Sequence, residues 1–338
     1  MAQRSRQRKP DTPDSAVLLP FAAMPVAQPP LPPRPFVGRD HDQAQVLRQL
    51  NQERVLLLTG IASSGKTALA ATMMQQAAHP RYWLPITSDF TDSAEAFLWR
   101  LAQPLAERHP DTWQALHQVR QAQWNYPPFV LFQMIMAAYD RSADEILLCI
   151  DGLNRHLEPA LVSLLRELGE HIRSTQHLPL KLLLVGRSIP YRLKPWPTLT
   201  LTGISPDALI HWAWQLGVAL DQPAASMLQQ QTAGLPGILE PILLAMRTQP
   251  DLLATMRIVD QLAVRQFFSE IVQQLSPPEK HMLTACAQQA VPITSIAYDQ
   301  LVTLTTLEDQ HLVHTNANQI VALHPLLQLV MEQYIAQE

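Results

Sequence analysis

The sequence predicts an α/β domain, in which helices cover both faces of a parallel sheet, followed by an all-helical domain and a winged-helix domain. Between residues 35 and 203, short apolar runs alternate with helical patterns, the order typical of a parallel sheet. Residues 204–274 have a helical pattern that is interrupted at residues 234–236. In residues 275–338, short helical segments lead to two apolar runs separated by a turn at residues 315–318 and then to a closing helix, which indicates a winged helix.

The composition and charge of the chain restrict the classes of protein to consider. At 338 residues, with 47% hydrophobic and 16% charged residues, the chain can bury the cores of two or three modules. Its net charge of −4 gives no sign of a nucleic-acid-binding surface. Of the two cysteines, Cys149 lies within an apolar run, so we expect a buried thiol and no disulfide framework.

The N-terminal segment has the composition of an extended tail. Residues 1–35 contain nine prolines and little hydrophobic periodicity, so we expect residues 1–34 to be a disordered, proline-rich tail. A basic start precedes an apolar stretch at residues 16–27, but Pro20 and Pro25 interrupt that stretch, which disfavours a signal peptide. No apolar stretch is long enough to span a bilayer. We therefore expect a cytoplasmic protein without membrane association.

The predicted α/β domain contains five strand candidates. We expect them at Arg54–Leu58, Tyr82–Ile86, Ile146–Ile150, Lys181–Val185 and Thr198–Leu201. Helical patterns such as Ala94–Glu107, Phe129–Tyr139 and Pro159–Ile172 separate them.

The most specific motif follows the first predicted strand. Residues 60–67 read G-x-x-x-x-G-K-T and lead into a helical pattern, as in a P-loop NTPase. Backbone N–H groups at the helix start can point at the β-phosphate, while Lys66 would bridge the β- and γ-phosphates and the Thr67 hydroxyl would bind Mg²⁺. A plain glycine-containing turn is disfavoured, because strand, loop, Lys-Thr pair and helix are all present. We therefore expect ATP or ADP to bind with Mg²⁺ at Gly60, Ser63, Ser64, Gly65, Lys66, Thr67 and Ala68.

Asp151 supplies the second feature of such a site. It follows five apolar residues, where an ionised carboxylate is costly unless a cation lies nearby, so we expect Asp151 to hold Mg²⁺ rather than to mark a surface turn. Many ATPases place an acidic residue next to orient the attacking water. Here Gly152 and Asn154 follow, and neither accepts a proton well. We therefore expect a weak ATPase whose hydrolysis is slow or depends on a group supplied from elsewhere.

Arg187 follows the next predicted strand. An arginine at a strand tip beside Asp151 could sense the γ-phosphate, and the alternative is a surface salt bridge. The residues themselves leave both interpretations open. With Lys66 and Asp151, Arg187 completes the set of candidate catalytic residues.

In their order along the chain, these motifs resemble those of the signal-transduction ATPases with numerous domains (the STAND class), above all its NB-ARC and NACHT-like branches. The resemblance covers roughly residues 34–338. Besides the P-loop, Asp151 and Arg187, it rests on three further motifs. These are Pro35-Phe36-Val37-Gly38-Arg39-Asp40, similar to the class signature F-V-G-R-[DE]; Gly234-Leu235-Pro236, similar to its G-L-P motif; and Leu323-His324-Pro325, similar to its Met-His-Asp motif.

The resemblance implies roles for further residues. The segment at residues 35–40 would wrap the adenine, with Val37, Gly38 and Arg39 at the base pocket. Pro236 would pack against the base. His324 would contact the β-phosphate of ADP and hold a closed state.

The leading hypothesis for function is a nucleotide-controlled conformational switch. ADP would hold the three domains together through Lys66, Pro236 and His324, and exchange for ATP would open the chain for self-assembly or for a protein partner.

The alternative is a DNA-associated, AAA+-like ATPase, such as an initiator or a transposition helper, that uses its winged helix. Residues 265–338 carry two Lys or Arg and seven Asp or Glu, a net charge of 2 − 7 = −5, which disfavours DNA as a partner. A small-molecule kinase ranks last, because the region after residue 205 would have no role in it.

Overall fold

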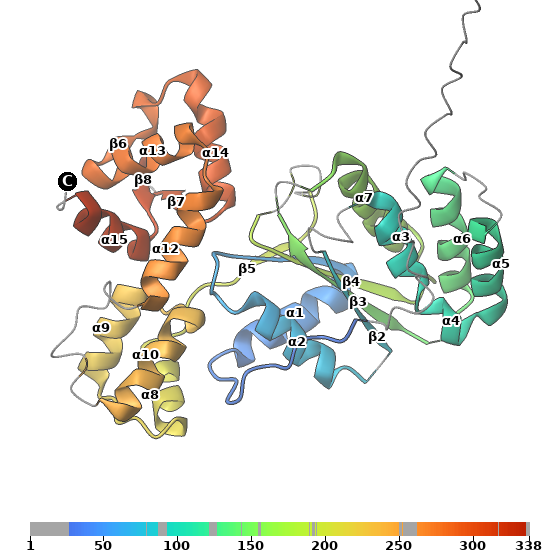
Figure 1. The fold of residues 1–338 in the computed structure, drawn as a ribbon, viewed down its shortest axis with the longest axis horizontal. Helices are drawn as coiled ribbons and strands as arrows, with labels where there is room; N and C mark the ends of the chain where they lie inside the picture. Colours follow the sequence, from blue (N-terminus) through green and yellow to red (C-terminus); the bar gives the residue numbers. More distant parts are fainter. Residues whose placement is uncertain are drawn as a thin grey trace, which may run out of the picture.

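A computed structural model gives the fold of the chain (Figure 1). The structure describes residues 27–78, 80–86, 93–121, 127–142, 144–154, 157–188, 190, 193, 195–249, 252, 262–316 and 318–335. The tail predicted for residues 1–34 therefore lies mostly outside the described residues.

Five parallel strands form the central sheet, in the order β2-β3-β4-β1-β5. Their bounds are β1 Val55–Thr59, β2 Arg81–Pro85, β3 Ile146–Leu153, β4 Leu180–Gly186 and β5 Thr198–Thr200. The five predicted strands are confirmed, with ends displaced by at most three residues. In this order β1 lies between β4 and β5, and β3 pairs with β4, so the ends of β1, β3 and β4 meet at one edge of the sheet.

Helices cover both faces of the sheet (Figure 1). Leu56 and Leu58 of β1 pack in one apolar cluster with α1 (Asp40–Glu53) and α2 (Lys66–Gln76). Val55 and Leu57 point to the opposite face, as expected for successive strand residues. The helices on that face are α3 (Ala94–Ala102), α4 (Leu105–Arg108), α5 (Pro110–Gln121), α6 (Pro128–Asp140) and α7 (Pro159–Ser174).

One predicted helix differs from the observed structure. The pattern at Ala94–Glu107 predicts a single helix, but the chain forms α3 and α4 there, with Pro104 at the start of the second. Proline has no N–H to donate and clashes with the preceding turn, so the helix ends before it although the apolar pattern continues.

The described part of the chain after the sheet is helical, as the sequence predicts. Its helices up to residue 274 are α8 (Pro206–Gln215), α9 (Gln222–Thr232), α10 (Pro236–Thr248) and α12 (Leu262–Gln274). Residues 250–261, also predicted to be helical, lie outside the described residues except Leu252. None of the described helices has the length and apolar character needed to cross a lipid bilayer.

The last part of the chain combines helices with a small antiparallel sheet of order β6-β8-β7. Its elements are α13 (Pro277–Gln288), β6 (Val291–Pro292), α14 (Leu301–Asp309), β7 (Val313–Thr315), β8 (Ile320–Leu323) and α15 (Pro325–Ile335). The predicted hairpin is confirmed, with Val313 opposite Leu323. The short edge strand β6 was not predicted.

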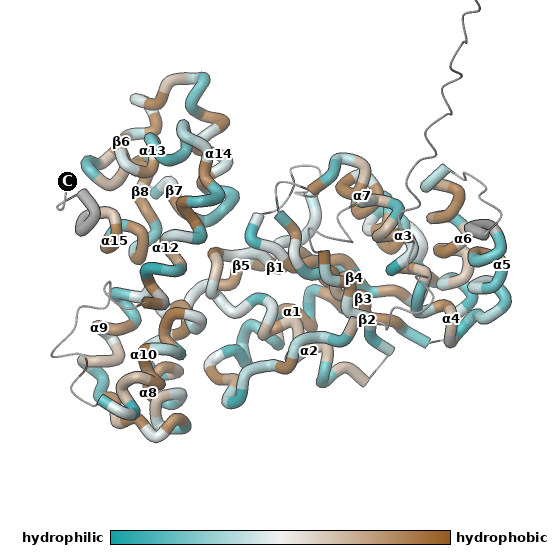
Figure 2. The backbone as a smooth tube through the Cα atoms, in the orientation of Figure 1, coloured by the Kyte–Doolittle hydropathy of each residue, from teal (hydrophilic) through white to brown (hydrophobic). Residues whose placement is uncertain are grey.

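The described residues between 204 and 335 share one apolar core, and we call this part of the chain the C-terminal lobe. The described residues between 27 and 203 form the sheet lobe. Figure 2 shows hydrophobic residues concentrated along the central strands and on the inner sides of these helices. The C-terminal core also takes in Ile61 and Ala62, which belong to the loop after β1 in the sheet lobe. The two lobes therefore meet at that loop.

Candidate nucleotide-binding site

The loop of residues 60–65 joins β1 to α2 in a conformation that few residues can adopt. Gly60, Ser63 and Gly65 have φ values of 147°, 65° and 90°. A Cβ atom on Gly60 would lie 2.5 Å from the carbonyl oxygen of Leu201, so only glycine lets the loop approach the chain after β5 this closely. Because α2 begins at Lys66, the unpaired N–H groups of its first turn lie at the loop, where they can bind an anion.

The ammonium group of Lys66 is buried within this loop. Its Nζ donates to the carbonyl oxygens of Gly60 at 2.8 Å and Ile61 at 2.7 Å, and lies 3.3 Å from Oγ of Ser64. Burial, together with the positive charge of Arg187, lowers the pKa of Lys66 to about 7, and the charge of Asp151 acts in the opposite direction. A bound phosphate would supply the negative charge that this site lacks.

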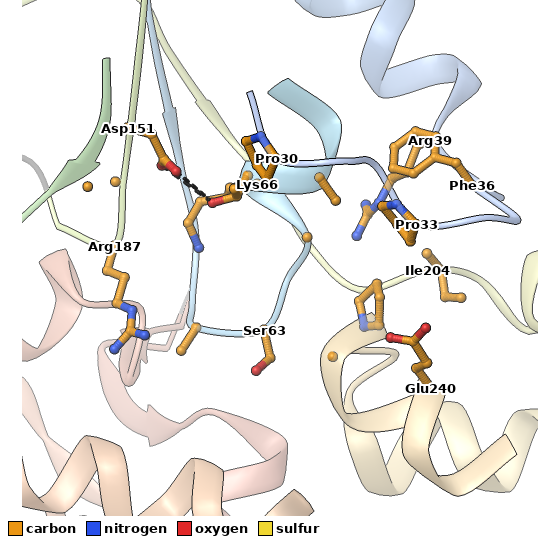
Figure 3. Close-up of a pocket in the computed structure, with 18 of the residues that line it drawn as sticks. Pro30, Pro33, Phe36, Arg39, Ser63, Lys66, Asp151, Arg187, Ile204 and Glu240 are labelled. Carbon is orange, nitrogen blue, oxygen red and sulfur yellow. Dashed lines mark hydrogen bonds between the residues drawn. The ribbon is translucent and has the colours of Figure 1, made fainter. Parts of the chain in front are cut away.

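Thr67 and Asp151 lie side by side at the end of the loop. The Thr67 hydroxyl donates to Oδ2 of Asp151 at 3.1 Å, a bond that the dashed line at Asp151 marks in Figure 3. Burial raises the pKa of Asp151, while the hydrogen bonds from Thr67 and the Gly152 N–H and the charge of Lys66 oppose that rise. A hydroxyl and a carboxylate this close fit Mg²⁺, which prefers oxygen ligands and would take its other ligands from water and phosphate. When bound there, Mg²⁺ would neutralise phosphate charge.

These groups open onto a pocket of about 850 Å³ between the two lobes. Figure 3 shows Lys66 and Asp151 at one end of the pocket, and Phe36, Ile204 and Glu240 at the other. Its lining comprises Pro30, Leu31, Pro33, Pro35, Phe36, Val37, Arg39, Ala62, Ser63, Gly65, Lys66, Thr67, Ala68, Asp151, Gly152, Leu153, Asn154, Gly186, Arg187, Ile204, Trp212, Pro236, Gly237, Glu240 and Gln274. The charged groups at the first end match the phosphates of a nucleotide, and the apolar side chains of Phe36 and Ile204 at the second end match its base.

Most of the residues predicted from the sequence meet at this pocket. Those that line it are Val37, Arg39, Ser63, Gly65, Lys66, Thr67, Ala68, Asp151, Arg187 and Pro236. Gly38, Gly60 and Ser64 are not among its lining residues. Gly38 packs against Ala208 of α8, and Ser64 is fully buried within the loop, so these residues shape the pocket from outside it.

Arg39 lines the pocket, but its guanidinium group is held by hydrogen bonds and an ion pair within the protein. It donates to the carbonyl oxygens of Ser64 at 2.8 Å and Thr202 at 2.6 Å, and pairs with Asp42 at 2.9 Å. Only 4% of Arg39 is exposed. Arg39 therefore ties the P-loop to the segment that leads into the C-terminal lobe, in addition to bordering the predicted base pocket.

Arg187 forms an ion pair across the two lobes. Its Nη2 lies 3.7 Å from Oε2 of Glu270 on α12. The salt bridge lies at the pocket itself, and a contact between Arg187 and a γ-phosphate stays a prediction.

His324 lies outside the pocket. It lines a second cavity of about 630 Å³, on the far side of Ile61, together with His311 and His314. His311 lies close to the P-loop, since its Nε2 lies 3.0 Å from Oγ1 of Thr59 at the end of β1. His324 is thus not among the residues that line the nucleotide pocket, and its contact with a β-phosphate stays a prediction.

Several pocket residues were missed by the sequence analysis. Pro30, Leu31 and Pro33 belong to the segment predicted to be a tail, and proline content alone does not distinguish a tail from a strap along a pocket. Trp212 and Glu240 lie on α8 and α10. Glu240 follows Pro236 by one helical turn and lies on the same face of α10. Because Pro236 was predicted to lie at the base, that spacing could have predicted Glu240 as a pocket residue.

The comparisons with known proteins agree with this geometry. Residues 35–185 match the AAA ATPase domain. This part of the chain is therefore a P-loop ATPase domain of the AAA type, which implies nucleotide binding. No curated protein matches the chain significantly.

Solved structures with the same fold span almost the whole chain. A Walker-type ATPase of Pyrococcus abyssi covers 92% of this chain and 99% of its own, with 14% identity and a TM-score of 0.65. A STAND protein with a tetratricopeptide repeat sensor from Pyrococcus horikoshii covers 92% of this chain, with 20% identity and a TM-score of 0.51. The present chain spans 44% of that protein's length. At these identities the likeness shows the fold alone.

The burial of His324 leads to a prediction about stability. Burial, with the nearby His314 and His311, lowers the pKa of His324 from 6.5 to about 4. The unfolded chain therefore binds a proton at a higher pH than the folded chain does. We expect the folded state to lose up to about 3 kcal/mol as the pH falls from 6.5 towards 4, and to keep its full stability above 6.5.

Urea unfolding at a series of pH values measures this effect. His324→Gln should remove a large part of the pH dependence, whereas His177→Gln, at a side chain 77% exposed, serves as the matched control. An unchanged pH dependence in His324→Gln would contradict the assignment.

Proposed function

We propose that this protein is a nucleotide-controlled conformational switch of the STAND type, which binds ATP or ADP with Mg²⁺ between its two lobes. One observation carries the proposal. The N–H of Gly237, at the start of α10, donates to the carbonyl oxygen of Ser63 in the P-loop at 3.0 Å, and the neighbouring Pro236 lines the pocket. The C-terminal lobe is thus bonded to the loop that would hold the phosphates.

A shared pocket links nucleotide binding to the arrangement of the lobes. A ligand can shift a conformational equilibrium only as far as its affinities for the two states differ. Here the phosphates would lie against Lys66 and the first turn of α2. The base would lie among Phe36, Val37 and Ile204, next to Trp212 of α8. Separation of the lobes would break contacts on one side of the nucleotide, so its affinity must differ between the closed and open states.

The C-terminal module supports a role in protein contacts. We assign α13, α14 and the sheet β6-β8-β7 to a winged helix. The exposed side of α14 carries Val302, 73% exposed, beside Tyr298, 89% exposed. The charged residues of α14 are Glu308 and Asp309. Such a surface favours a protein partner, or a second copy of this chain in the ATP state, over DNA.

The residues after Asp151 support slow hydrolysis. Asn154 lines the pocket, and its Nδ2 lies 3.3 Å from the carbonyl oxygen of Gly152. Of the described lining residues, Asp151 and Glu240 carry carboxylates, and Glu240 lies at the base end. An attacking water at the phosphate end therefore meets an amide where a general base would be needed.

Removal of the Lys66 ammonium tests the proposed site. Native mass spectrometry of the purified protein should find bound ADP or ATP. We expect Lys66→Ala to weaken ADP binding at least about tenfold, because it removes a charged hydrogen-bond donor to phosphate. Titration calorimetry measures the affinity, and Lys280→Ala, at an exposed lysine of α13, is the control. A wild-type protein that is purified empty and does not take up ADP would reject the proposal.

Replacement of Asp151 tests the metal site. With Mg²⁺ the wild type should bind ATP more tightly than with a chelator, and Asp151→Asn should abolish that difference because it removes the anionic ligand. Asp144→Asn, at a side chain 66% exposed, is the matched control. Wild-type turnover should stay well below about 1 per second, the low end for kinases. Fast turnover would show that another base reaches the phosphate.

A further inference from the structure

Glu240 brings a carboxylate to the end of the pocket that is proposed for the base. It lies on α10, one helical turn after Pro236, and both residues line the pocket. In Figure 3 its side chain extends from α10 toward the pocket and Ile204. Ile204 and Phe36 give the same end an apolar surface. A base that packs against these side chains therefore has a charged acceptor within reach of its edge.

The arginine at this end of the pocket is held by other groups. Arg39 lies near Phe36 in Figure 3 and lines the same pocket. Its guanidinium group pairs with Asp42 and donates to two backbone carbonyl oxygens. These bonds hold Arg39 in the wall of the pocket, so Glu240 is placed to serve the ligand.

This end of the pocket favours a ligand that donates hydrogen bonds. A carboxylate accepts hydrogen bonds and donates none. Pro33 and Pro236 also line the pocket, and proline has no backbone N–H to offer. The edge of a base that faces Glu240 should therefore present a donor.

Purine bases differ in the group that they carry at position 6. Adenine has an amino group there, which donates, whereas guanine and hypoxanthine have a carbonyl oxygen, which only accepts. Opposite a carboxylate, the amino group gains a charge-assisted hydrogen bond, but the carbonyl oxygen meets a negative charge. A carboxylate at this position thus favours adenine and disfavours the 6-oxo purines.

We propose that Glu240 selects adenine by accepting a hydrogen bond from its 6-amino group, a specificity that rests on the function proposed above. Glu240 belongs to the C-terminal lobe, whereas Phe36 belongs to the sheet lobe. The amino group is therefore bonded only while the two lobes are closed on the base. An adenine nucleotide thus stabilises the closed arrangement more than a hypoxanthine nucleotide with the same ribose and phosphates.

The test compares ADP with IDP, its hypoxanthine analogue, by titration calorimetry on the full chain. We expect the wild type to bind ADP about five- to tenfold more tightly, the range of one hydrogen bond at a partly exposed site. Glu240→Gln should bring the two affinities to within about twofold, mainly by tightening IDP, because an amide can also donate to the carbonyl oxygen. Since Glu240 is exposed, this substitution should leave folding intact.

A matched control and a third nucleotide separate the outcomes. Glu170→Gln neutralises a half-exposed carboxylate that pairs with Arg166 on α7, and it should keep the wild-type ratio of affinities. GDP has the 6-oxo group and an added 2-amino group, so it should bind as weakly as IDP. If GDP binds more tightly than IDP in the wild type but not in Glu240→Gln, Glu240 contacts the 2-amino group, and the selection of adenine is overturned.

Two other results would also overturn the selection by Glu240. They are equal affinities for ADP and IDP in the wild type, and the same ratio of affinities in the wild type and in Glu240→Gln. A wild type that binds none of the three nucleotides would reject the proposed function, whereas these results reject only the role of Glu240.

Discussion

The contact between the P-loop and the start of α10 is the constraint on which the rest of the structure depends. Gly237 donates its N–H to Ser63, and the side chains of Ile61 and Ala62 pack in the core of the C-terminal lobe. The loop that would hold the phosphates is therefore also a contact surface between the lobes. Any rearrangement of this loop on nucleotide binding must act on both lobes, because close-packed interiors transmit strain.

Charged groups are distributed along the pocket according to the parts of a nucleotide. Lys66 and Arg187 lie at the phosphate end with Asp151, which can hold Mg²⁺ there. Arg39, in contrast, is bound to backbone carbonyl oxygens and stabilises the loop. In the absence of a phosphate, burial and the field of Arg187 disfavour the charged form of Lys66. A bound anion would therefore stabilise the charged form of Lys66, so the electrostatics of the pocket depend on its ligand.

Much of the fold and part of the site could be predicted because their signals are local. The five strands and the P-loop depend on patterns within a few residues, and their order places Asp151 and Arg187 at the same edge of the sheet. Helix α10 could also be anticipated to start at Pro236. Contacts between distant segments could not be predicted in this way. The pairing of Arg187 with Glu270 depends on how α12 packs against the sheet lobe, which no local pattern encodes.

The positions of the histidines also depend on contacts between distant segments. The order of motifs pointed to His324, at the end of β8, whereas the packing of the C-terminal lobe brings His311 next to β1. Likewise, the segment at residues 27–36 has a tail-like composition, but its Pro30 and Pro33 line the pocket. The pocket exists only in the folded chain, so the composition of the segment could not predict this position.

Hydrogen–deuterium exchange with and without Mg²⁺ and ADP tests most directly whether one nucleotide is held by both lobes. The account predicts slower exchange in two segments far apart in sequence: residues 60–76, which form the P-loop and α2, and the first turn of α10 after Pro236. Protection confined to residues 60–76, with α10 unaffected, would contradict it. The nucleotide would then be a ligand of the sheet lobe alone.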